Sequence, residues 1–246
     1  MQKIQNQVDN FDKNNKEKVN KILKKNKNHI THEIINYIDS MTNNNEQGQK
    51  ELLNFLKEKL IIDKKNASLL DGLIFTKLKK QKTKKINIEL NQLFPNGIVQ
   101  FANSLKIDYQ PLQTLLLNQN FQDADKLTQQ YLCQLTQLEQ EKQRKWLYFT
   151  DIQLIPSEDL LTLDLLWQIY SYGKFGFSIQ RKIWLTNNYN WDIFLNKIGW
   201  VQNEINKRYP QEFTWTIEAP KGHLPLFNQL RGIQVLSYLF KHIAWK

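Results

Sequence analysis

Apolar residues recur at helical spacing along most of this chain, and the run from Asp159 to Leu185 has the clearest pattern. Leu163, Leu166 and Tyr170 fall on one helical face, which predicts a buried helix. Gly173 can end this helix in a left-handed conformation, because glycine has no Cβ that would clash.

Two phenylalanines, Phe175 and Phe177, flank Gly176 between this helix and a second one that we expect to begin near Ser178. This pattern leaves two interpretations open. The corner can plug a hydrophobic core, or it can present an apolar ligand surface on a mobile loop.

The other apolar runs predict an all-α fold, with one segment of a different pattern. Phe213 to Ile217 alternates like a strand, but the sequence offers no partner strand, so we expect an extended loop. Helical spacing is found at 19–23, 30–38, 52–60, 69–78, 86–93, 112–117, 127–138, 191–200 and 226–240.

The chain divides into three parts by composition. Residues 1–16 are polar and rich in asparagine and lysine, so we expect them to be disordered. Residues 17–94 predict a small helical bundle or an array of paired helices. The turn at Pro95-Asn96-Gly97 marks a boundary, after which residues 100–246 form a core domain.

The formal net charge is +10, which raises the possibility of nucleic-acid binding. The lysine excess lies before about residue 90, and the chain has only four arginines, at 144, 181, 208 and 231. We interpret this lysine preference as the codon bias of an AT-rich genome. The basic surface is then partly a by-product, and we expect no nucleic-acid partner.

No run of about 18 uncharged apolar residues is present, so we expect no transmembrane helix. The first residues lack a secretory apolar core, arginine and serine, so no cleaved targeting segment is expected. The single cysteine, Cys133, excludes a disulfide framework and fits a reducing compartment.

The titratable residues offer little for catalysis or for a metal site. His29 and His32 have no third histidine or cysteine near them, and Cys133 has no adjacent base. His223 is expected to make a structural hydrogen bond at a helix start. We therefore expect no enzyme, no catalytic residue and no metal ligand.

Two pairs of acids are candidate acid–base groups. They are Asp123 with Asp125 and Glu158 with Asp159. Each pair lies where a helix N-terminus favours negative charge, so helix capping is the better interpretation.

All seven tryptophans lie after residue 145. This is more aromatic area than a helical core of this size needs, so we expect part of it to line a groove that binds an apolar ligand.

Several uncommon motifs in the second half of the chain occur in the order typical of one family. They are RKWLYFT (144–150), PSEDL (156–160), SYGKFGFSIQRKIW (171–184), IGW (198–200) and APKGHLPLFNQLRG (219–232). With these motifs the chain resembles the genomes-uncoupled-four family, the tetrapyrrole-binding regulators of magnesium chelatase, over residues 108–245.

This resemblance implies an all-α core shaped like a cupped hand that holds protoporphyrin IX or magnesium-protoporphyrin IX. It also implies stimulation of magnesium chelatase through its large porphyrin-binding subunit. The N-terminal helices are similar to the accessory domain of cyanobacterial members. We expect a monomer, and peripheral membrane association stays open.

A porphyrin needs an aromatic wall and cations for its carboxylates. Arg231 and Tyr209, where relatives carry tryptophan, match ligand-contact positions of the family. Gln129 and Gln234 stand where cyanobacterial relatives carry arginine, which puts affinity and ligand orientation in question. The expected ligand-contact residues are Phe149, Phe175, Phe177, Ile179, Tyr209, Phe213, Trp215 and Arg231.

The composition and the resemblance together favour a plastid-encoded protein of the chloroplast stroma, with a cyanobacterial cytoplasm as the alternative. Two other function classes compete. A basic helical nucleic-acid-binding protein would leave the aromatic half unexplained, and an enzyme of tetrapyrrole metabolism would need a catalytic constellation that the sequence does not offer.

Overall fold

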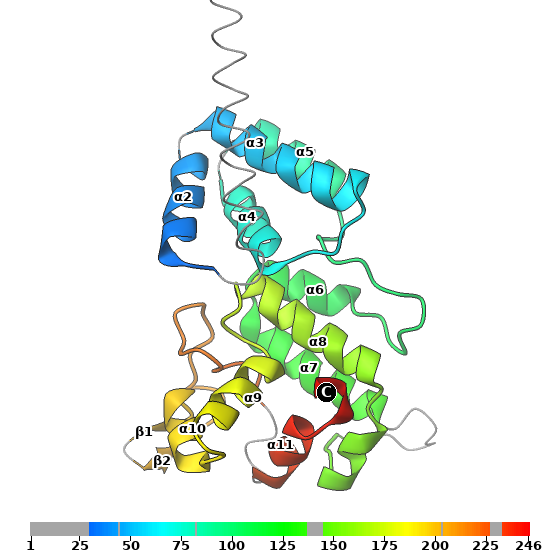
Figure 1. The fold of residues 1–246 in the computed structure, drawn as a ribbon, viewed down its shortest axis with the longest axis vertical. Coiled ribbons are helices and arrows are strands. Elements are labelled where there is room, and N and C mark those ends of the chain that lie inside the picture. The colour runs from blue at the N-terminus through cyan, green and yellow to red at the C-terminus, as the bar shows by residue number, and fades with distance from the viewer. Residues whose placement is uncertain (1–29, 44, 82, 137–144, 203, 227–232) are drawn as a thin grey trace, which may run out of the picture. The chain divides into compact units, whose positions relative to one another are not determined.

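A computed structural model describes residues 30–43, 45–81, 83–136, 145–202, 204–226 and 233–246 (Figure 1). The predicted disorder at 1–16, the expected helix at 19–23 and Arg231 lie outside these residues. Helices dominate the described part of the chain, so the all-α fold class is confirmed. Contacts divide the chain into two compact units, Met1–Ile98 and Val99–Lys246. That these units are independent domains stays a prediction.

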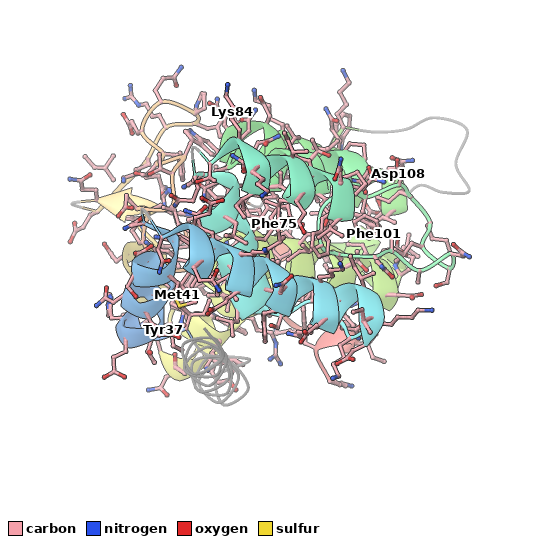
Figure 2. All side chains as sticks on the ribbon, turned by 90° about the horizontal axis from the view of Figure 1, so that it is seen from above. Tyr37, Met41, Phe75, Lys84, Phe101 and Asp108 are labelled. Atoms are coloured by element: carbon pink, nitrogen blue, oxygen red, sulfur yellow. The ribbon has the colours of Figure 1, made fainter. Side chains whose placement is uncertain are left out.

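The described part of the N-terminal unit is built from amphipathic helices that share one core. Its apolar runs produce helices close to the expected ranges, and in Figure 2 Phe75 lies among the helices, with Tyr37 and Met41 one turn apart on α2. Ile38, Leu52 and Leu73 are completely buried. The elements are α2 (His32–Thr42), α3 (Glu46–Leu56), the π-helix η1 (Lys57–Ile62), α4 (Leu69–Lys79) and α5 (Lys84–Leu93).

The C-terminal unit is organised around α8 (Ser157–Tyr170), the helix predicted from the clearest apolar pattern. Leu163, Leu166 and Tyr170 are completely buried, and α8 packs against α6 and η4. The other elements are α6 (Gln110–Leu117), α7 (Phe121–Leu135), the 3-10 helix η2 (Phe149–Leu154), α9 (Phe177–Thr186), α10 (Trp191–Lys197), α11 (Ile233–Phe240) and the 3-10 helix η4 (Ile243–Trp245).

Two short strands form a small antiparallel hairpin after α10. Val201–Gln202 (β1) pairs with Ile205–Asn206 (β2), with Val201 opposite Asn206. Neither this hairpin nor η2 was predicted. The segment from Phe213 to Ile217 has no strand structure, as expected.

The acids in the first turn of α8 bind the preceding segment. Asp159 Oδ1 accepts from the Lys106 amide at 3.0 Å and from the Tyr109 hydroxyl at 2.9 Å, and Glu158 accepts from Ser104 at 2.9 Å. Their position at a helix start was predicted, but their role is to hold residues 104–109 against α8. The pKa of the Tyr109 phenol is raised by its burial and by the Asp159 carboxylate.

Candidate ligand-binding site

The corner between α8 and α9 is built on left-handed backbone. Tyr172, Gly173 and Gly176 have φ of 60°, 76° and 132°. Helix α8 therefore ends as expected, and α9 begins at Phe177.

Gly176 is required by a close approach between two helices. A Cβ at this position would lie 2.7 Å from Asp164 Oδ1. That oxygen accepts from the Ser178 amide at 2.9 Å, so a carboxylate of α8 caps the start of α9. Gln168 donates to Asp164 Oδ2 at 2.6 Å and to Ser178 Oγ at 3.0 Å. Burial raises the pKa of Asp164, and the bonds from Ser178 oppose this rise.

Phe175 and Phe177 are completely buried. The ring of Phe175 meets Phe121 at 5.4 Å and Trp167 at 6.4 Å between centroids, both edge-on. The structure therefore shows the first of the two interpretations, a corner that plugs the core. Ligand contact by these two rings stays a prediction that requires the corner to open.

The corner is also tied to the segment from Ile217 to Pro225. The Gly176 amide donates to Leu224 O at 3.0 Å, and the Gly222 amide donates to Lys174 O at 2.8 Å. The ammonium of Lys174 donates to Ile217 O at 2.5 Å. These bonds join two segments that are more than 40 residues apart.

The second group of predicted residues forms what we call the aromatic loop, residues 207–217. Tyr209 lies edge-on to Trp215 at 5.9 Å, and Trp215 contacts Phe213 at 6.2 Å. Phe213 in turn contacts buried Trp200 at 6.5 Å. Tyr209 is 38% exposed whereas Phe213 is 5% exposed, so the loop leads from the surface into the core.

The indole of Trp215 helps to close the loop. Its Nε1 donates to Pro210 O at 2.9 Å, so the ring is held by a hydrogen bond while part of its surface stays open. An aromatic ring fixed in this way loses little side-chain entropy when a flat ligand contacts it.

His223 anchors the aromatic loop from inside. Its Nδ1 lies 2.6 Å from Ile198 O, and Nε2 accepts from the Thr214 amide at 3.2 Å. These two bonds require a neutral ring with its proton on Nδ1. Burial lowers the pKa of His223, which agrees with that state. The structural hydrogen bond predicted for His223 is confirmed, but its partners, Ile198 O and the Thr214 amide, do not belong to a helix start.

Helix α7 meets the chain just beyond the aromatic loop. Asp125 Oδ1 accepts from the Leu226 amide at 2.6 Å, and Gln129 Nε2 donates to Leu226 O. The two side chains lie four residues apart on one helical face, and together they hydrogen-bond both the N–H and the C=O group of Leu226. Burial raises the pKa of Asp125 to about 8, although the bond from Leu226 and the charge of Lys126 lower it.

Burial raises the pKa of the Tyr209 phenol, the carboxylates of Asp125 and Asp123 raise it further, and the charge of Lys126 lowers it. The sequence interpretation gave Asp125 only a helix-capping role. The spacing of an acid and an amide four residues apart on an apolar helix was the signal that could have revealed the contact with Leu226.

Phe149 and Ile179 lie on other elements. Phe149, in η2, is 38% exposed, and its ring centroid is 4.9 Å from that of Tyr238 on α11. Ile179 is half-buried on α9. The described residues thus bring Tyr209, Phe213 and Trp215 together. Of the other predicted contacts, Phe149 belongs to η2, Phe175 to the corner, and Phe177 and Ile179 to the first turn of α9, while Arg231 lies outside the described residues.

The described residues contain no group of three or more His, Cys, Asp or Glu side chains that could hold a metal ion. Within the same residues, no helix is long and apolar enough to cross a membrane. Cys133 is buried.

Comparison with known proteins places these features in a family. A family model described as GUN4-like matches residues 102–243. The ycf53 protein of Porphyra purpurea is 52% identical over 179 residues, which are 73% of this chain and 75% of that protein. The Arabidopsis thaliana protein named "Tetrapyrrole-binding protein, chloroplastic" is 39% identical over 143 residues, 54% of each chain.

The solved structure of GUN4 from Chlamydomonas reinhardtii has a TM-score of 0.54 at 36% identity, and it covers 60% of this chain and 93% of its own. The resemblance found in the sequence motifs is confirmed, because the family model matches more than half of the chain. This chain belongs to the GUN4-like family.

Proposed function

We propose that this chain binds protoporphyrin IX and magnesium-protoporphyrin IX and has no catalytic activity of its own. The observation that carries the proposal is the aromatic loop, in which Tyr209 and Trp215 are partly exposed while Phe213 and His223 fix the loop from inside. The tetrapyrrole-binding name of the Arabidopsis relative supports the choice of ligand.

A porphyrin is a flat apolar disc with two carboxylates on one edge, so one face can rest on aromatic rings. We expect a dissociation constant near micromolar for the burial of one such face, which corresponds to a binding free energy of about −8 kcal/mol. In this proposal Tyr209, Phe213 and Trp215 form the wall. Phe149, Phe175, Phe177 and Ile179 extend it, the two corner phenylalanines only if the corner opens.

The carboxylate side of the ligand needs cations. Arg231 is proposed to bind one propionate, although it lies outside the described residues. Gln129, which donates to Leu226 O, and Gln234, which is exposed on α11, carry neutral amides, so neither supplies a charge. We therefore expect a charge deficit at these two positions compared with relatives that carry arginine.

The proposed partner is the large porphyrin-binding subunit of magnesium chelatase, whose activity the porphyrin-loaded chain would stimulate as a monomer. The chloroplastic name of the Arabidopsis relative and the Porphyra relative support a plastid, with the stroma as the proposed compartment. Magnesium insertion measured with and without the chain tests this part of the proposal.

Ligand titration tests the binding directly. The full chain is titrated with protoporphyrin IX, and the quenching of tryptophan fluorescence is followed together with porphyrin absorbance. We expect Trp215→Leu to raise the dissociation constant about three- to tenfold, because one aromatic contact of the wall is lost.

Trp245→Leu is the matched control. Trp245 is also half-buried, and its indole also donates to a backbone carbonyl, that of Leu239 at 2.6 Å. Its loss is expected to leave absorbance-detected binding unchanged. If both variants bind with the affinity of the unmodified chain, the aromatic loop is not part of the binding site.

A further inference from the structure

Gln180, on the buried face of α9, holds two points of the chain beyond the aromatic loop. Its side chain is completely buried, and Nε2 donates to Gly222 O at 2.9 Å and to Pro225 O at 2.7 Å. Its Oε1 is also buried and has no hydrogen-bond partner among the described residues. Both partners of Nε2 are carbonyls, so only this orientation of the amide satisfies them.

Residues 222–226, which we call the anchor segment, depend on such side chains for their hydrogen bonds. All five residues are buried, and they belong to no helix or strand. Each of their carbonyls nevertheless accepts a hydrogen bond. The donors are Gln180 Nε2 for residues 222 and 225, Trp200 Nε1 for 223, the Gly176 amide for 224 and Gln129 Nε2 for 226. A buried carbonyl without a donor is costly, so these donors fix where the segment lies.

The anchor segment holds the aromatic loop through the ring of His223. Its Nε2 accepts from the Thr214 amide at 3.2 Å. Thr214 stands in the chain between Phe213 and Trp215, two residues of the proposed wall. A shift of the anchor segment would therefore move Thr214 and the two rings beside it.

The glutamine at position 180 is best explained by its N–H groups. A buried oxygen without a partner destabilises the fold, and an apolar side chain of the same length would avoid that cost. Such a side chain could not donate to Gly222 O and Pro225 O. The two donated bonds are thus what the amide adds at this place.

We propose that Gln180 is a positioning residue of the tetrapyrrole site, which sets the place of the aromatic loop by holding the anchor segment. This inference rests on the proposed function and adds a residue that acts on the ligand through His223 rather than by contact. A loop that is already in place loses less conformational entropy when the ligand binds. Affinity should therefore depend on the two bonds that Gln180 donates.

The test compares Gln180→Met with Gln113→Met in the full chain. Methionine has a similar length and no N–H group. Gln113 is the matched control, because it is also completely buried and also holds the backbone of another segment. Its Nε2 donates to Val99 O at 3.1 Å and its Oε1 accepts from the Val99 amide at 3.0 Å, so these two bonds lie outside the anchor segment and the aromatic loop.

Three quantities are measured: the melting temperature, hydrogen exchange of the Thr214 amide, and the dissociation constant for protoporphyrin IX well below the lowest melting temperature. We expect both variants to melt earlier than the unmodified chain. Only Gln180→Met should exchange the Thr214 amide faster and raise the dissociation constant, by about three- to tenfold.

If Gln180→Met does not melt cooperatively, Gln180→Glu takes its place in the comparison. Burial keeps such a carboxyl protonated, and its single O–H can donate to one of the two carbonyls. We then expect changes in the same direction but smaller.

The outcomes separate this inference from the proposed function. Unchanged affinity in a folded Gln180 variant, or equal weakening in Gln113→Met, would overturn the positioning role and leave the proposed function standing. Weaker binding with an unchanged Thr214 amide would overturn it as well, since the effect would not pass through the anchor segment. Absence of saturable binding by the unmodified chain would overturn the proposed function and this inference with it.

Discussion

At the scale of single residues, Asp125 has the most unusual environment in the candidate site. Its carboxyl is buried and accepts a hydrogen bond from the Leu226 amide at 2.6 Å. Among the described charges that act on its pKa, the one cation is the exposed Lys126. Burial penalises the ionised form more than these partners favour it, which raises the pKa from an ordinary 3.8 to about 8. At neutral pH the carboxyl is therefore mostly protonated.

Asp125 should make the protein less stable as the pH rises. Between pH 3.8 and about 8 the folded chain holds a proton at Asp125 that the unfolded chain has released. The stability linked to this proton is complete below the unfolded pKa and is lost as the pH rises through the folded pKa. A difference of one bound proton lowers the free energy of unfolding by about 1.4 kcal/mol for each pH unit. Each kcal/mol lost lowers Tm by about 2–4 °C.

Asp125→Asn should remove this slope, because an amide accepts from Leu226 without titrating. Melting temperatures of both proteins are measured from pH 5 to pH 9. The difference in Tm, variant minus unmodified chain, should grow with pH up to about 8 and then level off. Asp164, whose pKa is also raised, contributes equally to both curves and cancels. Parallel curves would show that Asp125 is ionised throughout this range.

Gly176 illustrates what the sequence does not reveal at this scale. The pattern of two phenylalanines around a glycine was interpreted partly as a deformable backbone. In the structure the missing Cβ makes room for Asp164 Oδ1. A glycine at a close contact and a glycine in a flexible loop look alike in the sequence, because the contact involves a residue twelve positions away.

At the scale of elements, the corner between α8 and α9 is held by backbone hydrogen bonds to residues 222–224 and by packing of Phe175. Gly176 N donates to Leu224 O, Gly222 N donates to Lys174 O, and Phe175 is buried against Phe121 and Trp167. Since none of these contacts needs a ligand, the corner should be ordered in the empty protein.

Hydrogen exchange can check this expectation. The amides of Gly176 and Gly222 should be protected to a similar degree with and without porphyrin, because their acceptors lie in buried or half-buried backbone. The exposed amide of Glu218, which donates to Thr216 Oγ1 at 3.4 Å, serves as the fast-exchanging reference. Strong protection that appears only with ligand would instead favour the mobile loop that the glycine pattern also allowed.

The helices themselves were largely predictable, since burial of one face imposes the 3.6-residue period. The prediction for α8 was accurate because most of its buried positions are large and apolar, although Asp159 and Asp164 are buried among them. The 3-10 helix η2 and the hairpin of β1 and β2 were missed, since segments of six and two residues are too short for a period to emerge. The extended loop at 213–217 was predicted because a strand without a partner cannot satisfy its backbone.

At the scale of the whole molecule, the many aromatic residues in the second half of the chain lie in two kinds of environment. Trp167 and Trp200 are completely or almost completely buried, so part of the aromatic area belongs to the core after all. Tyr209 and Trp215 stay partly open. Composition indicates how much aromatic area a chain carries, but only the packing of distant segments decides which rings face the ligand.

The C-terminal unit contains every described contact that shapes the candidate site. The bonds of Asp125, Lys174 and His223 all join residues between 99 and 246, and the family model matches within the same range. We therefore predict that residues 99–246 alone fold and bind protoporphyrin IX with a dissociation constant within about twofold of that of the full chain.

Circular dichroism melting and porphyrin titration of this fragment, beside the full chain, provide the measurement. A cooperative melt establishes that the fragment is folded. The titration then compares the porphyrin affinity of the folded fragment with that of the full chain. If the fragment melts cooperatively but binds more than about tenfold more weakly, the N-terminal unit contributes to the site, and the ligand cannot be held by the aromatic loop alone.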